Sequence, residues 1–246
     1  MNDSNIVFGS MRMYEYDYSN QHWVNLFNVM YEKGINIHHV SNEYESFNLY
    51  CDVLKEFNNI YPEKRIKHIV KLAEPHFDSN IFVPELLLLK INEYRQALQI
   101  ENELFGIQWM WRGSLSDDLS RCKQFNDSEI QIKNYISFLK REKLIERFYV
   151  FPYSIIFAQA VLKIENVYND FFDGFIVYRN YMELEYDTIL DESKKSNLIL
   201  RPLNAGKTLD EQNAKDSFLF ALSHKNVSAG IISISSVAKL NEIYDV

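Results

Sequence analysis

The segment GINIHHVSNEY, residues 34–44, has the form of a short buried strand that ends in polar side chains. Seven further apolar runs recur along the chain, with longer amphipathic stretches between them. The eight predicted strands are NIVF (5–8), INIHHV (35–40), KHIVK (67–71), FGIQWMW (105–111), RFYVF (147–151), GFIVY (174–178), NLILR (197–201) and AGIIS (229–233). This alternation is typical of βα units with a parallel sheet. Eight such units predict an α/β fold, a (β/α)8 TIM barrel that occupies residues 1–246 as one domain.

The segments between the strands have helical periodicity. In IQIKNYISFLKREK (130–143), the apolar residues Ile132, Tyr135, Ile136 and Leu139 recur at the spacing of one helix face. We expect this helix in the outer ring of the barrel. We expect the polar segment DESKKSN (191–197) to be a short loop within the domain.

Composition excludes several classes of protein. The formal charge of −8 opposes the neutralisation of phosphates on which nucleic-acid binding depends. Cys51 and Cys122 are isolated and predict reduced thiols. The first residues, MNDSNIVFGS, lack a basic segment followed by an apolar run, and no stretch is apolar enough to span a membrane. We therefore expect a cytoplasmic protein with a small-molecule substrate; the sequence leaves its oligomeric state open.

In a parallel barrel the active site forms where the strands end. Polar or charged residues end four of the predicted strands: His38 and His39 before SNEY, Lys71, the pair Trp111 and Arg112, and Arg201. Because alternate residues of a strand share a face, Ile69 and Lys71 point the same way.

Five blocks, in order, resemble the aldo/keto reductase superfamily. FGSMRM (8–13) resembles the opening strand of that family, and GINIHHVSNEY (34–44) resembles its GINxxDTAxxYG block. HIVKL (68–72) resembles the strand that carries the family's lysine, RPLNAGK (201–207) resembles its SPLxxG loop, and residues 221–243 resemble its closing strand and helix. The chain resembles a short, catalytically divergent member.

The resemblance implies an active site of Tyr, Lys, Asp and His. Tyr44 stands in place of the proton-donating Tyr, and Lys71 in place of the Lys that lowers its pKa. The Asp falls on His39 and the His on Trp111, so we expect Lys71 to lack its acidic partner. We expect His39 to orient its neighbours or to relay a proton. Either Tyr44 and Lys71 keep a catalytic role, or they remain only as packing residues.

Trp111 and Arg112 would place an aromatic wall and a cation at the site, which suit an anionic or sugar-like substrate. A metal site is not expected, because His38 and His39 are neighbours on a strand and face opposite ways.

By the same resemblance, NADP or NAD would bind with its phosphates near the seventh loop and the last helix. Arg201, Asn204 and Lys207 provide charge and polarity on the loop, and Gly206 provides flexibility. Ser233, Ser235, Ser236 and Lys239 surround the start of a helix near Val237, where free N–H groups attract anions.

The nicotinamide end departs from the family. Its Ser-Asn pair falls on Phe151 and Pro152, and its Gln falls on Ile176, with Tyr178 and Asn180 as alternative contacts.

These features lead to one hypothesis and two alternatives. The first is an oxidoreductase that uses NAD(P)H on a carbonyl or hydroxyl of a polar metabolite such as a sugar derivative. The alternatives are a non-redox isomerase or lyase that keeps Tyr44 and Lys71 for proton transfer, and a pseudoenzyme that binds a ligand at the barrel mouth.

Overall fold

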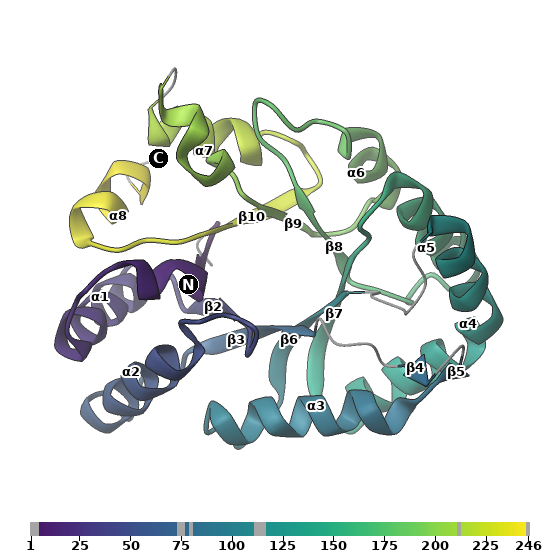
Figure 1. Ribbon diagram of the computed structural model, residues 1–246, viewed down its shortest axis with the longest axis horizontal. Helices are drawn as coiled ribbons and strands as arrows, with labels where there is room; N and C mark the ends of the chain where they lie inside the picture. Colours follow the sequence, from purple (N-terminus) through teal and green to yellow (C-terminus); the bar gives the residue numbers. More distant parts are fainter. Residues whose placement is uncertain (1–4, 73–76, 79–80, 111–116, 211–212, 245–246) are drawn as a thin grey trace.

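The computed structural model describes residues 5–72, 77–78, 81–110, 117–210 and 213–244. Eight parallel strands form a closed barrel in the order β1-β10-β9-β8-β7-β6-β3-β2. The helices form a ring around these strands, as Figure 1 shows. The predicted (β/α)8 barrel is confirmed.

All eight predicted strands belong to the barrel, with ends within two residues of those expected. Their bounds are Ile6–Gly9 (β1), Ile37–Val40 (β2), Lys67–Leu72 (β3), Leu104–Met110 (β6), Ile145–Phe151 (β7), Gly174–Tyr178 (β8), Asn197–Leu200 (β9) and Val227–Ile232 (β10). A separate antiparallel pair, Phe77–Asp78 (β4) and Ile81–Phe82 (β5), lies in the connection after β3.

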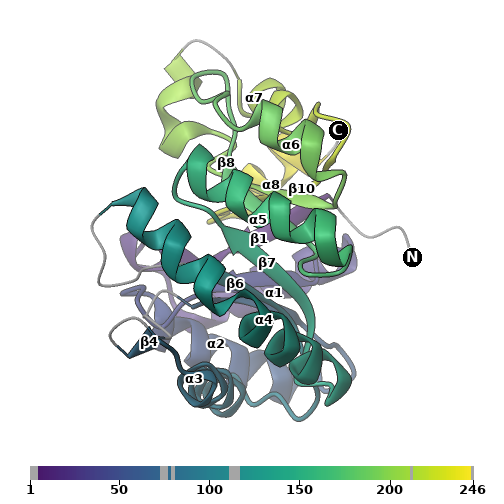
Figure 2. The same ribbon diagram turned by 90° about the vertical axis from the view of Figure 1, so that its right-hand side faces the viewer.

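The α-helices are Asn20–Glu32 (α1), Phe47–Ile60 (α2), Pro84–Ala97 (α3), Asp118–Arg141 (α4), Ile155–Tyr168 (α5), Asp187–Ser193 (α6), Ala214–Leu222 (α7) and Val237–Tyr244 (α8). Two 3-10 helices, Ser10–Glu15 (η1) and Asn204–Asp210 (η2), follow β1 and β9. Helices α4 and α5 lie side by side on the outside of the barrel, as seen in Figure 2.

Two expected segments differ in extent from the structure. The helix expected at 130–143 is the second half of the longer α4, which begins after the N-cap Asp117, whose side chain accepts from Ser120 N at 2.8 Å. The segment 191–197 is not wholly a loop, because α6 continues to Ser193 and β9 begins at Asn197.

The entry into β2 is fixed by a glycine. Gly34 follows α1 with φ of 80°, a conformation that favours glycine, and Ile35 N bonds back to Met30 O at 2.9 Å. This turn ends the helix and starts the strand that leads to His39.

Buried apolar side chains form two layers. The larger layer lies between strands and helices and includes Trp109, which is 1% exposed. The smaller cluster, inside the barrel, contains Val7, Ile69, Tyr149, Ile176, Leu198, Ala229 and Ile231. Trp109 is therefore a core residue.

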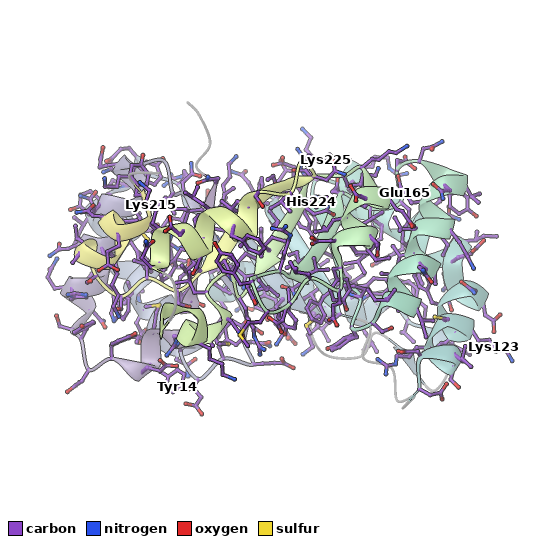
Figure 3. The ribbon with its side chains drawn as sticks, turned by 90° about the horizontal axis from the view of Figure 1, so that it is seen from above. Tyr14, Lys123, Glu165, Lys215, His224 and Lys225 are labelled. Atoms are coloured by element: carbon purple, nitrogen blue, oxygen red, sulfur yellow. The ribbon has the colours of Figure 1, made fainter. Side chains whose placement is uncertain are left out.

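The two ends of the barrel are separate surfaces. In Figure 3, Tyr14 and Lys123 lie along one edge, and Glu165, His224 and Lys225 lie along the opposite edge. Tyr14 follows β1, whereas His224 and Lys225 precede β10, so the first edge is the carboxyl end of the strands. His39 and Lys71, near the ends of β2 and β3, belong to that end.

Candidate active site

Three of the sequence-predicted residues come together where β2 and β3 end. The rings of His39 and Tyr44 are 6.2 Å apart, and Lys71 Nζ lies 5.2 Å from the centre of the Tyr44 ring. His39 is 2% exposed, and Tyr44 and Lys71 are partly buried. This group forms the base of the candidate site.

A fourth residue, Gln108, reaches the group from β6. Its Cα is the register partner of Lys71. Gln108 Oε1 accepts a hydrogen bond of 2.6 Å from His39 Nε2, and both side chains are buried. Sequence reasoning expected Trp111 to complete the group. The signal for Gln108 was a polar residue within the otherwise apolar run FGIQWMW.

The charge of His39 is set by its burial. Burial lowers the pKa of His39 to about 4, against the hydrogen bond to Gln108, and the charge of Lys71 lowers it further. His39 is therefore neutral near pH 7 and cannot balance an ammonium charge.

Lys71 does have an acidic partner, which corrects the expectation that it would lack one. Lys71 Nζ donates to Glu43 Oε2 at 2.8 Å, with side-chain exposures of 14% and 30%. Glu43 precedes Tyr44 in the loop after β2. The carboxylate is thus supplied by the loop and not by the strand position of His39.

The pKa of Tyr44 moves opposite to the expected direction. Burial raises it above its usual value, and the nearby Tyr94, Glu43 and Tyr178 raise it further. Lys71 Nζ approaches the ring, and no hydrogen bond joins it to the Tyr44 hydroxyl. Tyr44 therefore holds its proton firmly.

An aromatic layer follows at the ends of β6, β7 and β8. Met110 and Phe151 pack with the partly buried Tyr153, Tyr178 and Leu200. The ring of Phe151 lies 5.0 Å from that of Tyr153 and 5.4 Å from that of Tyr178. These side chains form an apolar layer at the ends of the strands.

Three residues expected at the nicotinamide end are apolar or already hydrogen-bonded within the protein. Phe151 and Ile176 are buried apolar residues. Asn180 Nδ2 donates to Glu183 at 2.5 Å and to Arg201 O at 3.1 Å, and its Oδ1 accepts from Met182 N at 2.9 Å. The Asn180 side chain is therefore used for hydrogen bonds within the protein, and Tyr178 remains as the alternative contact to a nicotinamide.

The seventh loop carries two exposed cations. The Arg201 guanidinium lies 4.6 Å from the centre of the Tyr178 ring, and Lys207 lies in η2. Asn204 Nδ2 contacts Met182 Sδ at 3.2 Å. Within η2, Gly206 has φ of 92°. The turn thus presents charge beside the aromatic layer.

The start of α8 gathers the other expected phosphate contacts. Lys239 Nζ donates to Ser235 Oγ at 3.0 Å, and Ser236 Oγ accepts from Lys239 N at 3.2 Å as a helix cap. Ser233 Oγ donates to Gly9 O at 2.8 Å. Each of these groups therefore has a partner within the protein.

Lys239 also reaches Tyr16, the residue that follows η1, since its Nζ lies 3.3 Å from the Tyr16 hydroxyl. Burial raises the pKa of Tyr16, but hydrogen bonds with Ser235 and Lys239 outweigh burial and lower it overall. An anion arriving here would compete with Tyr16 for the ammonium group of Lys239.

Trp111 and Arg112, the expected substrate contacts, lie outside the described residues. Within the described ranges, no group of three or more His, Cys, Asp or Glu side chains is arranged to hold a metal ion. No helix in those ranges is long and apolar enough to cross a membrane.

The fold is similar to solved aldo-keto reductases over nearly the whole chain. A Pseudomonas aeruginosa protein named as a candidate aldo-keto reductase is 16% identical, with a TM-score of 0.72 over 98% of this chain and 88% of that one. A Klebsiella pneumoniae aldo/keto reductase in complex with NADP and acetate is 14% identical, with a TM-score of 0.68 over 99% and 85%.

An aldo-keto reductase of Bacillus halodurans, in its holo form, is 15% identical, with a TM-score of 0.66 over 99% of this chain and 86% of that one. No protein-family model and no curated protein matches the sequence. The resemblance drawn from the five sequence blocks is confirmed as a likeness of fold.

Proposed function

We propose that this protein is an NAD(P)H-dependent oxidoreductase that acts on a carbonyl or hydroxyl group. The observation that carries the proposal is the position of Lys71 Nζ, 5.2 Å from the Tyr44 ring centre, where β2 and β3 end. Carboxyl ends of barrel strands are where such folds keep their chemistry. The fold likeness to aldo-keto reductases, one of them complexed with NADP, supports it.

The chain offers a dinucleotide two different surroundings. Arg201 and Lys207 on the seventh loop, with Lys239 and Ser235 at the start of α8, suit phosphate groups. Asn204, Ser233 and Ser236 belong to the same two segments. Phe151 and Tyr178 offer ring faces without the amide partners that a carboxamide would use. These two segments could hold the phosphates of the dinucleotide, whereas its nicotinamide ring would bind by stacking alone.

In the reaction we propose, Tyr44 donates its proton to the carbonyl oxygen of the substrate. NAD(P)H, when bound, would supply the hydride to the carbonyl carbon. Tyr44 is protonated at neutral pH, and because its raised pKa makes the phenol a weaker acid, the adjacent Lys71 stabilises the charge that develops as the proton leaves. His39 is neutral and hydrogen-bonded to Gln108, and its ring packs beside that of Tyr44 and helps to orient it.

The substrate we propose is a polar metabolite, such as a sugar derivative that carries an anionic group. The aromatic face of Tyr153 stacks on a sugar ring, whereas Arg201 and Tyr178 are assigned to the cofactor. Trp111 and Arg112 are proposed to add a further aromatic wall and cation.

Hydride transfer is the direct test. The purified protein is mixed with NADPH or NADH and a panel of aldehydes, including phosphorylated sugars, and absorbance of the reduced cofactor is followed. A parallel thermal-shift screen includes nucleotide sugars, because a ligand at 100 times its Kd stabilises by about 2.7 kcal/mol. Cofactor oxidation that depends on the aldehyde supports the proposal. Folded protein that neither binds nor oxidises either cofactor would falsify it.

A second candidate is a non-redox function on the same barrel. Phe151 and Ile176, both apolar, occupy the expected carboxamide contacts, which favours a ligand other than a nicotinamide. An isomerase or lyase would use Tyr44 and Lys71 for proton transfer, whereas a pseudoenzyme would only bind. Stabilisation by a nucleotide sugar without any stabilisation by a dinucleotide would favour this candidate.

A further inference from the structure

The loop that joins β2 to α2 is folded tightly against the candidate site. Tyr44 N donates to Ser41 O at 3.1 Å, and Glu43 N donates to Ser41 Oγ at 3.2 Å. Phe47 N donates to Tyr44 O at 2.9 Å, where α2 begins. These bonds fix the backbone on both sides of Glu43.

Tyr94, on α3, ties this loop to the end of β3. Its hydroxyl oxygen accepts from Asn42 N at 2.8 Å. Its hydroxyl hydrogen faces two acceptors, Asn42 Oδ1 at 2.7 Å and the backbone oxygen of Lys71 at 2.9 Å. The Tyr94 ring also packs edge-on against Phe47, with centroids 5.8 Å apart. One side chain therefore holds the neighbour of Glu43 and the backbone of Lys71 together.

This arrangement sets the geometry of the ion pair. Glu43 Oε2 lies 2.8 Å from Lys71 Nζ, and the lysine side chain is only 14% exposed. A buried ammonium is costly without a carboxylate or several hydrogen bonds. His39 does not provide the charge, because it is neutral and its Nε2–H is donated to Gln108.

We propose that Glu43 is the positioning residue that holds the Lys71 side chain beside Tyr44, and that Tyr94 holds Glu43 in place. The inference rests on the proposed function, which it deepens. The carboxylate partner of the active-site lysine has moved from the strand to the adjoining loop. In this chain the strand position is occupied by a neutral imidazole instead.

Three variants test the role in catalysis. Glu43→Gln keeps the shape of the side chain and removes its charge. We expect kcat to fall about tenfold or more, which corresponds to the loss of a hydrogen bond to a charged group, and KM to change less than about twofold. Glu43→Asp should restore part of kcat. Tyr94→Phe keeps the ring, loses the hydroxyl and should give an intermediate kcat. Glu93→Gln, which breaks the ion pair with Lys90 on the outer surface of α3, is the matched control and should behave as wild type.

A second readout does not depend on activity. Acetic anhydride modifies lysine amines that it can reach, so the acetylation rate of Lys71, followed by peptide mass spectrometry, reports how closely the ion pair with Glu43 holds the amine. We expect severalfold faster acetylation of Lys71 in Glu43→Gln than in wild type, with Lys225 as the internal standard. Circular dichroism checks that each variant is folded.

The two claims fail in different ways. If wild type transfers no hydride, the proposed function fails, and the acetylation rates still decide the role of Glu43. If Lys71 is acetylated at the same rate in folded Glu43→Gln and wild type, the inference about Glu43 is overturned, whatever the activity.

Discussion

The imidazole of His39 donates a 2.6 Å hydrogen bond to the carboxamide oxygen of Gln108 across the inside of the barrel. Replacing Gln108 with Leu leaves that N–H buried without an acceptor, which should lower the free energy of unfolding by about 1–3 kcal/mol. Urea denaturation measures the loss. As a control, Gln21→Leu breaks an exposed bond to Asn25 on α1 and should change stability by less than about 0.5 kcal/mol. Equal stability of Gln108→Leu and wild type would contradict a structural role for the pair.

Tyr44→Phe should abolish hydride transfer and leave NADPH affinity almost unchanged. The phenol acts only as charge develops on the substrate oxygen, so its loss affects the transition state and not the bound ground state. Steady-state kinetics with an aldehyde and a fluorescence titration with NADPH measure the two effects. Because the hydroxyl alone is removed, an equal loss of affinity and turnover would argue against Tyr44 as the proton donor.

The rate of carbonyl reduction should stay constant from neutral pH to about pH 10. The donor must be protonated, and the pKa of Tyr44 is raised above its ordinary value of about 10, chiefly by burial. Only at still higher pH should the phenol ionise and the rate fall. The measurement is kcat/KM for one aldehyde across the range, with circular dichroism at each pH. A fall centred below about pH 9, in protein that remains folded, would show that another group donates the proton.

Arg201→Ala should weaken NADPH binding by about 1.5–3 kcal/mol, the range for hydrogen bonds to charged groups. Arg201 is an exposed cation on the loop after β9, beside the Tyr178 ring. Isothermal titration calorimetry at fixed ionic strength measures the change. Lys225→Ala removes a cation from the opposite end of the barrel (Figure 3) and should leave the affinity unaltered. Should both variants bind as wild type does, the seventh loop is not the phosphate site.

Acid should destabilise the fold through a buried chain of side chains outside the candidate site. The Tyr50 hydroxyl lies 2.9 Å from both His38 Nδ1 and His68 Nε2, between the barrel and α2. Burial lowers the pKa of His38 well below its usual value and that of His68 to about 3. Unfolded histidines bind protons at about pH 6.5, so the unfolded state takes up more protons below that pH. Stability present above pH 6.5 should therefore be lost as the pH falls from about 6.5 towards 3.

His68→Gln tests this linkage. The amide keeps a partner for Tyr50 and does not titrate, so the slope of unfolding free energy against pH should be shallower by about 1.4 kcal/mol per pH unit near pH 5. Urea melts at several pH values between 4 and 7.5 give the slope. His68→Gln and wild type with parallel curves would show that His68 does not titrate in this way.

Much of the fold could be predicted from the sequence because it depends on local patterns. Alternation of apolar runs with amphipathic stretches located all eight barrel strands. The polar endings of two of these runs pointed to His39 and Lys71, and the five ordered blocks indicated Tyr44. The period of two along a strand placed Lys71 on the face of Ile69, whose side chain packs inside the barrel.

The partners of these residues were decided only by the tertiary structure. Gln108 meets His39 because β6 is aligned with β3, and β3 with β2, in one particular register. Glu43 meets Lys71 because the loop after β2 turns back over the end of β3. The Tyr94 hydroxyl, on a helix more than forty residues further along the chain, holds this loop against the strand end. The sequence alone determined which side chains lie at the strand ends, since that depends on neighbours in the chain. It could not determine which of them pair, because hydrogen bonds and ion pairs depend on distances between segments that only the closed barrel brings together.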